Sequence, residues 1–149
     1  MLVGRVMIKE VVITKLDIIN TIGGSVMHTM KASSAGYAGF GEAYFSQVDK
    51  GAIKAWKRHK KMTLNLVVPV GEIRFVLFDD REVLNTQFQE IIISKDDYYR
   101  LTVPPMVWMG FQGLSEGSAM LLNIANIEHD PDEVNRKKMS EINYNWSIS

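Results

Sequence analysis

The sequence contains no cysteine in its 149 residues, and this absence excludes several kinds of chemistry at once. A chain without thiols has no disulfide framework, no thiolate nucleophile and no zinc–thiolate site. The absence also fits a reducing compartment, and we expect a cytoplasmic protein.

Net charge and long apolar runs are also missing. The 17 basic and 17 acidic residues give a formal net charge of zero, so no overall field attracts nucleic acid or an anionic membrane. The opening MLVGRVMIKE lacks the apolar region of a signal peptide, and no apolar run approaches the ~20 residues that span a bilayer. We therefore expect neither a nucleic-acid partner nor a membrane partner.

Enough apolar sequence is present for one core. Hydrophobic residues make up 46% of the chain, and the length suits a single domain over residues 1–149. Short β-type runs alternate with turn residues, which predicts an all-β sandwich or barrel. We expect strands at 43–48, 63–70, 72–78, 88–94, 98–103 and 119–127, a basic strand after a turn at 49–51, and a short strand within 11–22. Residues 31–41 are interpreted as a loop.

The C-terminal segment carries the one clear helix signal. Asp130 is a suitable N-cap, Pro131 suits the first helical position, Asp132 and Glu133 favour the positive N-terminal end, and Arg136, Lys137 and Lys138 follow. These residues predict a short C-terminal helix that ends before Asn143.

Positive charge is concentrated in one segment of this neutral chain. The basic residues there are Lys50, Lys54, Lys57, Arg58, Lys60 and Lys61. In an extended strand, residues two apart share a face, so Lys57 and His59 point the same way. A charge run is often a solvated face. On a barrel strand, half of it would instead face a polar interior, where cations need anions such as a nucleotide diphosphate.

The same stretch has the spacing of the first cupin motif. Glycines stand at both ends of the motif, and Lys57, His59 and Leu64 occupy its ligand positions. The histidine position of the second motif falls on Met109. An ammonium, a leucine and a methionine do not suit a transition metal held by imidazole and carboxylate. We therefore predict a metal-free cupin, a double-sheet jelly roll.

Two residues are candidates for proton transfer. His59 is the best general base, because an ordinary histidine titrates near about 6.5. Its alternative role is structural, with a hydrogen bond inside the barrel. Tyr44 precedes the basic cluster, where a phenol can donate a proton. Core packing is the alternative for Tyr44, as it is for Trp56 and Trp108.

Several motifs, taken in order, resemble one enzyme family. They are GAIK (51–54), VGE (70–72), FDDR (78–81), RLTVPP (100–105), GF (110–111), LSE (114–116) and the closing INYNW (142–146). Their order and spacing resemble the dTDP-4-dehydrorhamnose 3,5-epimerase family over roughly residues 40–146. Residues 54–64 with PPMVW (104–108) are also similar to the sugar-nucleotide 3,4-ketoisomerases.

This resemblance implies a cupin-fold homodimer without metal or cofactor. Its substrate would be a nucleotide-linked 4-keto-6-deoxy sugar, with a dTDP-sugar expected, used for surface polysaccharides such as lipopolysaccharide. By position, Lys54 replaces an arginine that meets the diphosphate, Lys57 stands where the epimerases have their base histidine, and His59 matches the second ketoisomerase histidine. Asn123 stands at the position of the acid tyrosine, and Met139 lies near that of an aspartate that orients the base.

The resemblance and the residues together give one set of predicted site residues. His59, Lys57 and Tyr44 are predicted to be catalytic. Lys54, Gln47, Asn65 and Arg74 are predicted to bind substrate, with Gln47 at the place of a substrate-facing glutamine.

Three hypotheses for the function follow from these residues. The first is an isomerase or single-position epimerase with His59 as base and Lys57 polarising the keto oxygen or stabilising the enolate. The second is a cupin that binds a nucleotide sugar without catalysis. The third is a structural jelly roll whose basic face contacts another protein.

Overall fold

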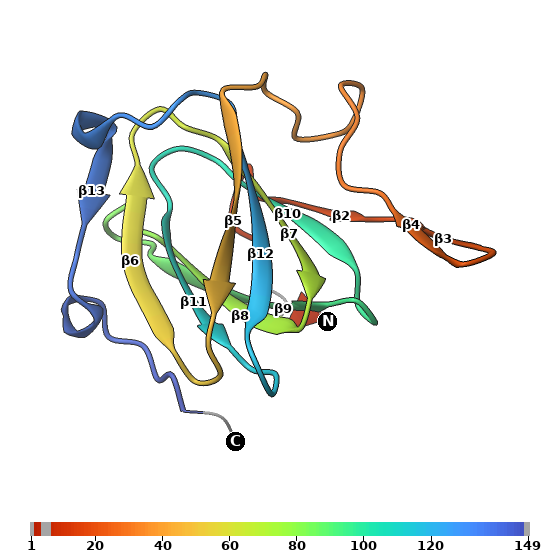
Figure 1. Cartoon of the computed structure of the whole chain (residues 1–149). Coiled ribbons are helices and arrows are strands. Elements are labelled where there is room, and N and C mark those ends of the chain that lie inside the picture. Colours follow the sequence, from red (N-terminus) through yellow and green to blue (C-terminus); the bar gives the residue numbers. More distant parts are fainter. Residues whose placement is uncertain (1, 4–6, 148–149) are drawn as a thin grey trace.

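The computed structural model describes residues 2–3 and 7–147, and its regular structure is almost entirely β-strand (Figure 1). The strands are β1 (Leu2–Val3), β2 (Val12–Lys15), β3 (Ile18–Thr21), β4 (Gly24–Met27), β5 (Glu42–Val48), β6 (Ile53–His59), β7 (Leu64–Val70), β8 (Glu72–Asp79), β9 (Gln87–Ser94), β10 (Tyr99–Val103), β11 (Trp108–Gly113), β12 (Ala119–Ala125) and β13 (Val134–Arg136). Two 3-10 turns, η1 (Pro131–Glu133) and η2 (Met139–Glu141), flank β13. No helix in the described part of the chain is long and apolar enough to cross a membrane.

Most strands belong to two antiparallel sheets. The six-stranded sheet has the order β1-β9-β8-β11-β6-β13, and the five-stranded sheet has the order β2-β10-β7-β12-β5. From β5 to β8 the chain alternates between the sheets at every strand, which is how a double-sheet jelly roll is built. The predicted all-β, double-sheet class is confirmed. β3 and β4 form a separate hairpin that extends away from both sheets (Figure 1).

The main core lies between the two sheets. In β9, the side chains of Gln89, Ile91 and Ile93 are buried and alternate with half-buried ones, as expected for a strand with one face on the core. The central strands β7 and β8 are buried on both faces over most of their length. Their outer faces are therefore covered as well, and on the six-stranded sheet an aromatic cluster that includes Trp56 and Trp146 provides this cover.

The predicted C-terminal helix is wrong. The capping signals are real, since Asp130 accepts a hydrogen bond from the Asp132 amide at 3.0 Å, but they start only the single turn η1. The chain then becomes β13, which pairs with the free edge of β6. Trp56 and Lys137 exchange two backbone hydrogen bonds, at 2.9 and 3.1 Å. An α-helix would leave these backbone groups of β6 unpaired, so tertiary pairing overrides the local signal.

Three further elements were not predicted. The segment 11–22 holds two strands, β2 and β3, and Gly23 at φ +86° turns the chain into β4. The strand β11 contains Gly110 and Gly113, and glycine weakens a strand signal. Its role is close packing, because a Cβ at Gly110 would lie 2.7 Å from the Cβ of Ala55.

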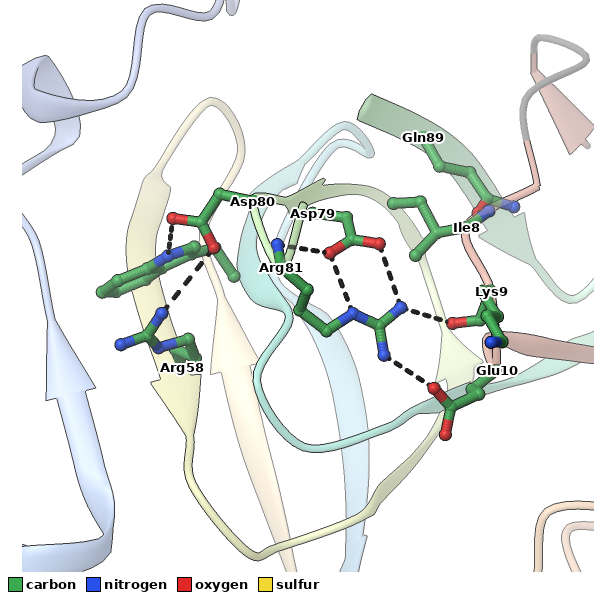
Figure 2. A network of polar contacts seen from close by, with 9 residues as sticks. Ile8, Lys9, Glu10, Arg58, Asp79, Asp80, Arg81 and Gln89 are labelled. Atoms are coloured by element: carbon green, nitrogen blue, oxygen red, sulfur yellow. Dashed lines mark hydrogen bonds and ion pairs between the residues drawn. The ribbon is translucent and has the colours of Figure 1, made fainter. Parts of the chain in front are cut away.

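The FDDR segment joins the end of β8 to its neighbours (Figure 2). Arg81 donates hydrogen bonds to both carboxylate oxygens of Asp79, each at 2.9 Å, and to Glu10 at 2.9 Å. Asp80 forms an ion pair with Arg58 of β6 at 3.7 Å. This motif therefore fixes the N-terminal segment and holds Arg58 on the outer face of β6.

Candidate active site

A cavity of about 390 Å³ lies between the two sheets. One wall comes from β5, β7 and β12, with Tyr44, Ser46 and Asn123 as its polar side chains. The facing wall comes from β6, β11 and β13 and carries the basic side chains.

The four positions that the cupin spacing identified all line this cavity. Lys57, His59, Leu64 and Met109 converge there from three different strands. Only His59 among them has a side chain that normally ligates a metal. Over the described residues, no group of three or more His, Cys, Asp or Glu side chains is arranged to hold a metal ion. The donor set of this cavity therefore does not suit one.

His59 is held by a buried carboxylate. Its Nδ1 lies 2.6 Å from Oε1 of Glu133, at the end of η1. The other oxygen of Glu133 accepts hydrogen bonds from the backbone amides of Lys61 and Met62, both at 2.9 Å. The Lys60 amide also donates to the Glu133 carbonyl at 2.8 Å, so Glu133 is fixed at both its backbone and its side chain.

These contacts set the protonation of both groups. Burial alone would raise the pKa of Glu133, but the hydrogen bonds from His59, Lys61 and Met62 outweigh it and hold that pKa below its ordinary value. Burial lowers the pKa of His59, and the charges of Lys57 and Arg136 lower it further. The hydrogen bond and the charge of Glu133 raise this pKa, but they do not outweigh the lowering effects. At neutral pH the carboxylate is charged and the imidazole is neutral. Nδ1 then carries the proton donated to Glu133, which leaves Nε2 as an acceptor.

Three cations surround His59 in the cavity, Lys54, Lys57 and Arg136, whereas the ammonium of Lys137 lies 4.9 Å over the ring of Trp108 on the outer face of the sheet. Arg136 pairs in register with Lys57 across β13 and β6, so two like charges stand side by side. Burial lowers the pKa of Lys57, and Arg136 and Lys54 lower it further. Among the described residues no carboxylate forms an ion pair with Lys54, Lys57 or Arg136. The basic wall thus has unneutralised positive charge facing the cavity.

The opposite wall carries a phenol. Tyr44 on β5 is 43% exposed and stands opposite Asn123 of β12 in the strand register. Burial raises the pKa of Tyr44, and Glu42 raises it further, so the phenol stays protonated at neutral pH. Asn123 donates to the Tyr44 carbonyl at 3.3 Å and to Ser46 Oγ at 3.1 Å. Tyr44 and His59 therefore reach the cavity from facing sheets.

The predicted site residues divide into two groups. The structure brings His59, Lys57, Lys54 and Tyr44 together at one cavity.

The other three predicted residues lie elsewhere. Gln47 is exposed and, by strand alternation, points away from the face that carries Tyr44. Asn65 is buried and accepts a hydrogen bond from Arg100 at 3.0 Å, and Arg74 donates to the Trp146 carbonyl on the outer face of the other sheet. None of these three residues lines the cavity that holds His59, and their role in substrate binding stays a prediction.

Two cavity residues, Arg136 and Lys137, and the partner of His59, Glu133, were missed because they follow the predicted helix start. Glu133 was interpreted as an acid favouring a helix N-terminus, and Arg136 and Lys137 as bases favouring its C-terminus. The useful signal was the VNR sequence at 134–136, whose β-branched first residue can extend a strand. Met139, near the position of the orienting aspartate, does not line the cavity, and Glu133 occupies that role from a different place in the chain.

Comparison with known proteins identifies the family. A dTDP-sugar isomerase from Desulfovibrio desulfuricans G20 is 34% identical, with 93% of this chain and 91% of that chain aligned at a TM-score of 0.87. This chain belongs to the dTDP-4-dehydrorhamnose 3,5-epimerase-like family of cupins. The family assignment made from the ordered motifs is therefore confirmed. No family model matches the sequence.

Two curated proteins to which this chain is similar are named for polysaccharide or glycan biosynthesis. A spore coat polysaccharide biosynthesis protein of Bacillus subtilis is 27% identical over 114 residues, covering 72% of this chain and 76% of that protein. A probable low-salt glycan biosynthesis epimerase of Haloferax volcanii is 29% identical over 97 residues, covering 61% of this chain and only 62% of that protein. A 3,5-epimerase of Bacillus anthracis, solved with TDP and pyrophosphate, shares the fold at 17% identity, 94% and 86% coverage and a TM-score of 0.81.

Proposed function

We propose that this protein is an isomerase or epimerase that moves a proton on a nucleotide-linked 4-keto-6-deoxy sugar, without a metal, in surface polysaccharide synthesis. One observation carries the proposal. A neutral imidazole, fixed through Nδ1 by Glu133, faces a cavity whose walls hold an ammonium and a phenol. Base, oxyanion partner and acid are the three groups that enolisation and reprotonation of a keto sugar require.

In the first step, His59 Nε2 removes a proton from a carbon next to the 4-keto group. The electron pair of the broken C–H bond forms the enolate double bond, and the carbonyl oxygen becomes negative. Glu133 stabilises the imidazolium that results, because its charged carboxylate already accepts the Nδ1 hydrogen bond. Lys57 projects from the same strand face as His59, so its ammonium can bind the developing oxyanion.

In the second step, the phenol of Tyr44 returns a proton to the enolate carbon. The carbonyl re-forms, the phenolate regains a proton from solvent, and the imidazolium of His59 releases its proton to solvent. Since Tyr44 and His59 come from facing sheets, the proton arrives on the face opposite to the one it left. That geometry favours inversion at a single carbon. Asn123, at the position of the acid tyrosine, has no acidic proton to give. Tyr44 pairs with it on the neighbouring strand and would supply the phenol instead.

The remaining cations fit the diphosphate of the substrate. Lys54 and Arg136 line the cavity without carboxylate ion pairs among the described residues, and both side chains are exposed, so a phosphate group can reach them. Lysine and arginine bind phosphate oxygens through charge-assisted hydrogen bonds. The epimerase of Bacillus anthracis that shares this fold was solved with TDP and pyrophosphate, which supports a dTDP-sugar as substrate.

We also propose that the protein works as a homodimer. The β3–β4 hairpin extends from the body and exposes Ile19, Ile22 and Val26 (Figure 1). A lone two-stranded hairpin is at best marginally stable in water, so this apolar arm needs a surface to pack on. A second copy supplies one, because β5 ends its sheet with a free edge and an exposed Phe45. Light scattering should give a dimer for the native protein and a monomer for Ile19→Lys.

The central experiment is proton NMR of dTDP-4-keto-6-deoxyglucose in deuterated water with the purified protein. We expect loss of the proton signal at one carbon next to the keto group, and no loss with His59→Gln. His28→Gln is the matched control, because His28 lies outside the cavity. Binding without exchange would instead favour a cupin that only binds nucleotide sugars. If neither binding nor exchange occurs, the substrate class is wrong.

A further inference from the structure

The C-terminal strap, defined here as residues 134–147, connects the cavity to the outer face of the six-stranded sheet. It begins as β13 at the edge of β6, passes through η2 and descends beside β6 (Figure 1). Arg136 and Lys137 lie near its start and line the cavity. Trp146 lies near its end and packs on the far side of the sheet.

Near the cavity the strap is held by short contacts to β6, among them hydrogen bonds from Arg58 to Asn135 at 3.0 and 3.2 Å and from Trp56 to the Met139 carbonyl at 3.2 Å. β13 is three residues long and pairs only with β6. At its last register position Arg136 stands beside Lys57, and like charges on paired strands repel. The backbone exchange between Lys137 and Trp56 is the last bond of this pairing.

Together with buried Ile142, Trp146 attaches the rest of the strap to the outer face of the sheet. Its side chain is 7% exposed, and its ring centroid lies 5.3 Å from that of Trp56, on the strand that carries the active-site cations. Gly110 makes room for it, since a Cβ there would stand 3.0 Å from the indole. Arg74 lies 5.6 Å from the ring and donates to the Trp146 carbonyl. Tyr144 adds a hydrogen bond to Glu90 of β9.

The two ends of the segment are thus fixed by different contacts. Glu133, just before the strap, is held by its own carboxylate and carbonyl, while the far end is held by Trp146. Arg136 lies between these anchors. Loss of the Trp146 anchor should therefore loosen this cation and leave His59 and Glu133 in place.

We propose that Trp146 is a positioning residue for substrate binding, which acts by anchoring the strap that holds Arg136 at the cavity. This rests on the proposed function, because it assigns Arg136 to the diphosphate. A residue that acts this way affects the affinity for the nucleotide and leaves the proton-transfer step unchanged. A merely structural residue would affect both steps or neither.

The test measures dTDP and inorganic pyrophosphate binding by calorimetry for Trp146→Ala, Trp146→Phe and the native protein. We expect Trp146→Ala to weaken binding by about tenfold or more, as for loosened charge-assisted contacts, and Trp146→Phe to restore much of the affinity. Exchange of the Lys137 amide should speed up by roughly 100-fold, as for a large cavity opened beneath one local segment. The kcat should stay within a factor of about two while KM rises.

Tyr98→Ala is the matched control, because Tyr98 is buried on the outer face of the other sheet. It should leave binding and Lys137 exchange unchanged. The decisive comparison repeats Trp146→Ala in a protein that already carries Arg136→Ala. If Trp146 acts through this cation, its effect on binding disappears there. Full additivity would overturn the proposal.

Two further outcomes keep the proposals separate. If Trp146→Ala does not fold, Tyr144→Phe removes only the hydrogen bond to Glu90 and should still speed Lys137 exchange and weaken binding. If the native protein binds dTDP and folded Trp146→Ala binds it equally well, positioning is refuted and the proposed function stands. If the native protein binds neither dTDP nor pyrophosphate, the diphosphate site is refuted and the positioning role with it.

Discussion

The contact between Glu133 and His59 makes the sharpest prediction about catalysis. Glu133→Gln keeps the size of the side chain and removes its charge. In the native protein three donors share the Glu133 carboxylate: His59 Nδ1 at 2.6 Å and the backbone amides of Lys61 and Met62 at 2.9 Å. A carboxamide has only one oxygen, so it cannot serve the imidazole from one atom and both amides from the other.

Either orientation of the new amide is costly. If its NH2 faces His59, Nδ1 must accept, the proton moves to Nε2, and the base is lost. If its oxygen faces His59, the backbone amides of Lys61 and Met62 lose their acceptor, which costs about 1–3 kcal/mol for each buried donor. With its NH2 toward His59, the carboxamide keeps an oxygen for both backbone amides, so this orientation costs less stability and is the one expected.

We therefore expect kcat for proton exchange to fall by about 10²–10⁴ in Glu133→Gln, the usual contribution of a positioned general base. KM for the dTDP-sugar should hardly change, because the cations are untouched. Solvent exchange followed by NMR measures kcat. Titration of His59 in Glu133→Gln should give a lower pKa than in the native protein, because the native Glu133 carboxylate raises the pKa of His59. Asp132→Asn removes the same charge from the adjacent exposed residue and is the control. A folded Glu133→Gln with native kcat would refute the role of Glu133.

Three other predictions follow from the same cavity. Tyr44→Phe should still exchange the substrate proton with solvent, since His59 is intact, but should fail to invert the carbon, which NMR of the product would reveal. Lys57→Met should lose activity yet melt at a higher temperature near pH 7. Burial, and then Arg136 and Lys54, lower the pKa of Lys57 in the folded protein below its ordinary value of 10.5. At pH 7 the charged ammonium therefore destabilises the folded state, and the uncharged Met removes this cost. A lower melting temperature for Lys57→Met would contradict this reasoning. Because burial lowers the pKa of His59 below 6.5, kcat/KM should fall with acid only below that value, and a midpoint above it would exclude His59 as the base.

Sequence patterns predicted the β-strands of the sheets better than the segments between and beyond them. The strands at 64–70 and 72–79 were found nearly to the residue, because apolar β-branched runs between turn glycines are a local signal. Lys57 and His59 were placed on one face by alternation alone. The sheet that each strand joins was not predicted, and this decides which side chains meet. Gln47 and Tyr44 are three residues apart, yet only Tyr44 reaches the cavity.

The C-terminal segment shows why the rest could not be predicted locally. Asp130 and Pro131 do begin a helical turn, as their chemistry requires, but nothing within 131–141 indicates that the edge of β6 lies free beside it. This edge belongs to a strand far away in the sequence, since the neighbouring His59–Glu133 contact joins residues 74 positions apart. The partner of the base was therefore visible only after the chain had folded.

The pairing of β13 with β6 explains how one short strand can serve both catalysis and binding. It brings Glu133 to His59 at one end and sets Arg136 beside Lys57 at the other, so the favourable contact is formed together with a repulsive one. An anion between Arg136 and Lys57 removes that repulsion. By linkage, whatever stabilises the docked strap must then tighten anion binding by the same factor, and anion binding must tighten the strap. The free energy of diphosphate binding thus also secures the strand that follows Glu133.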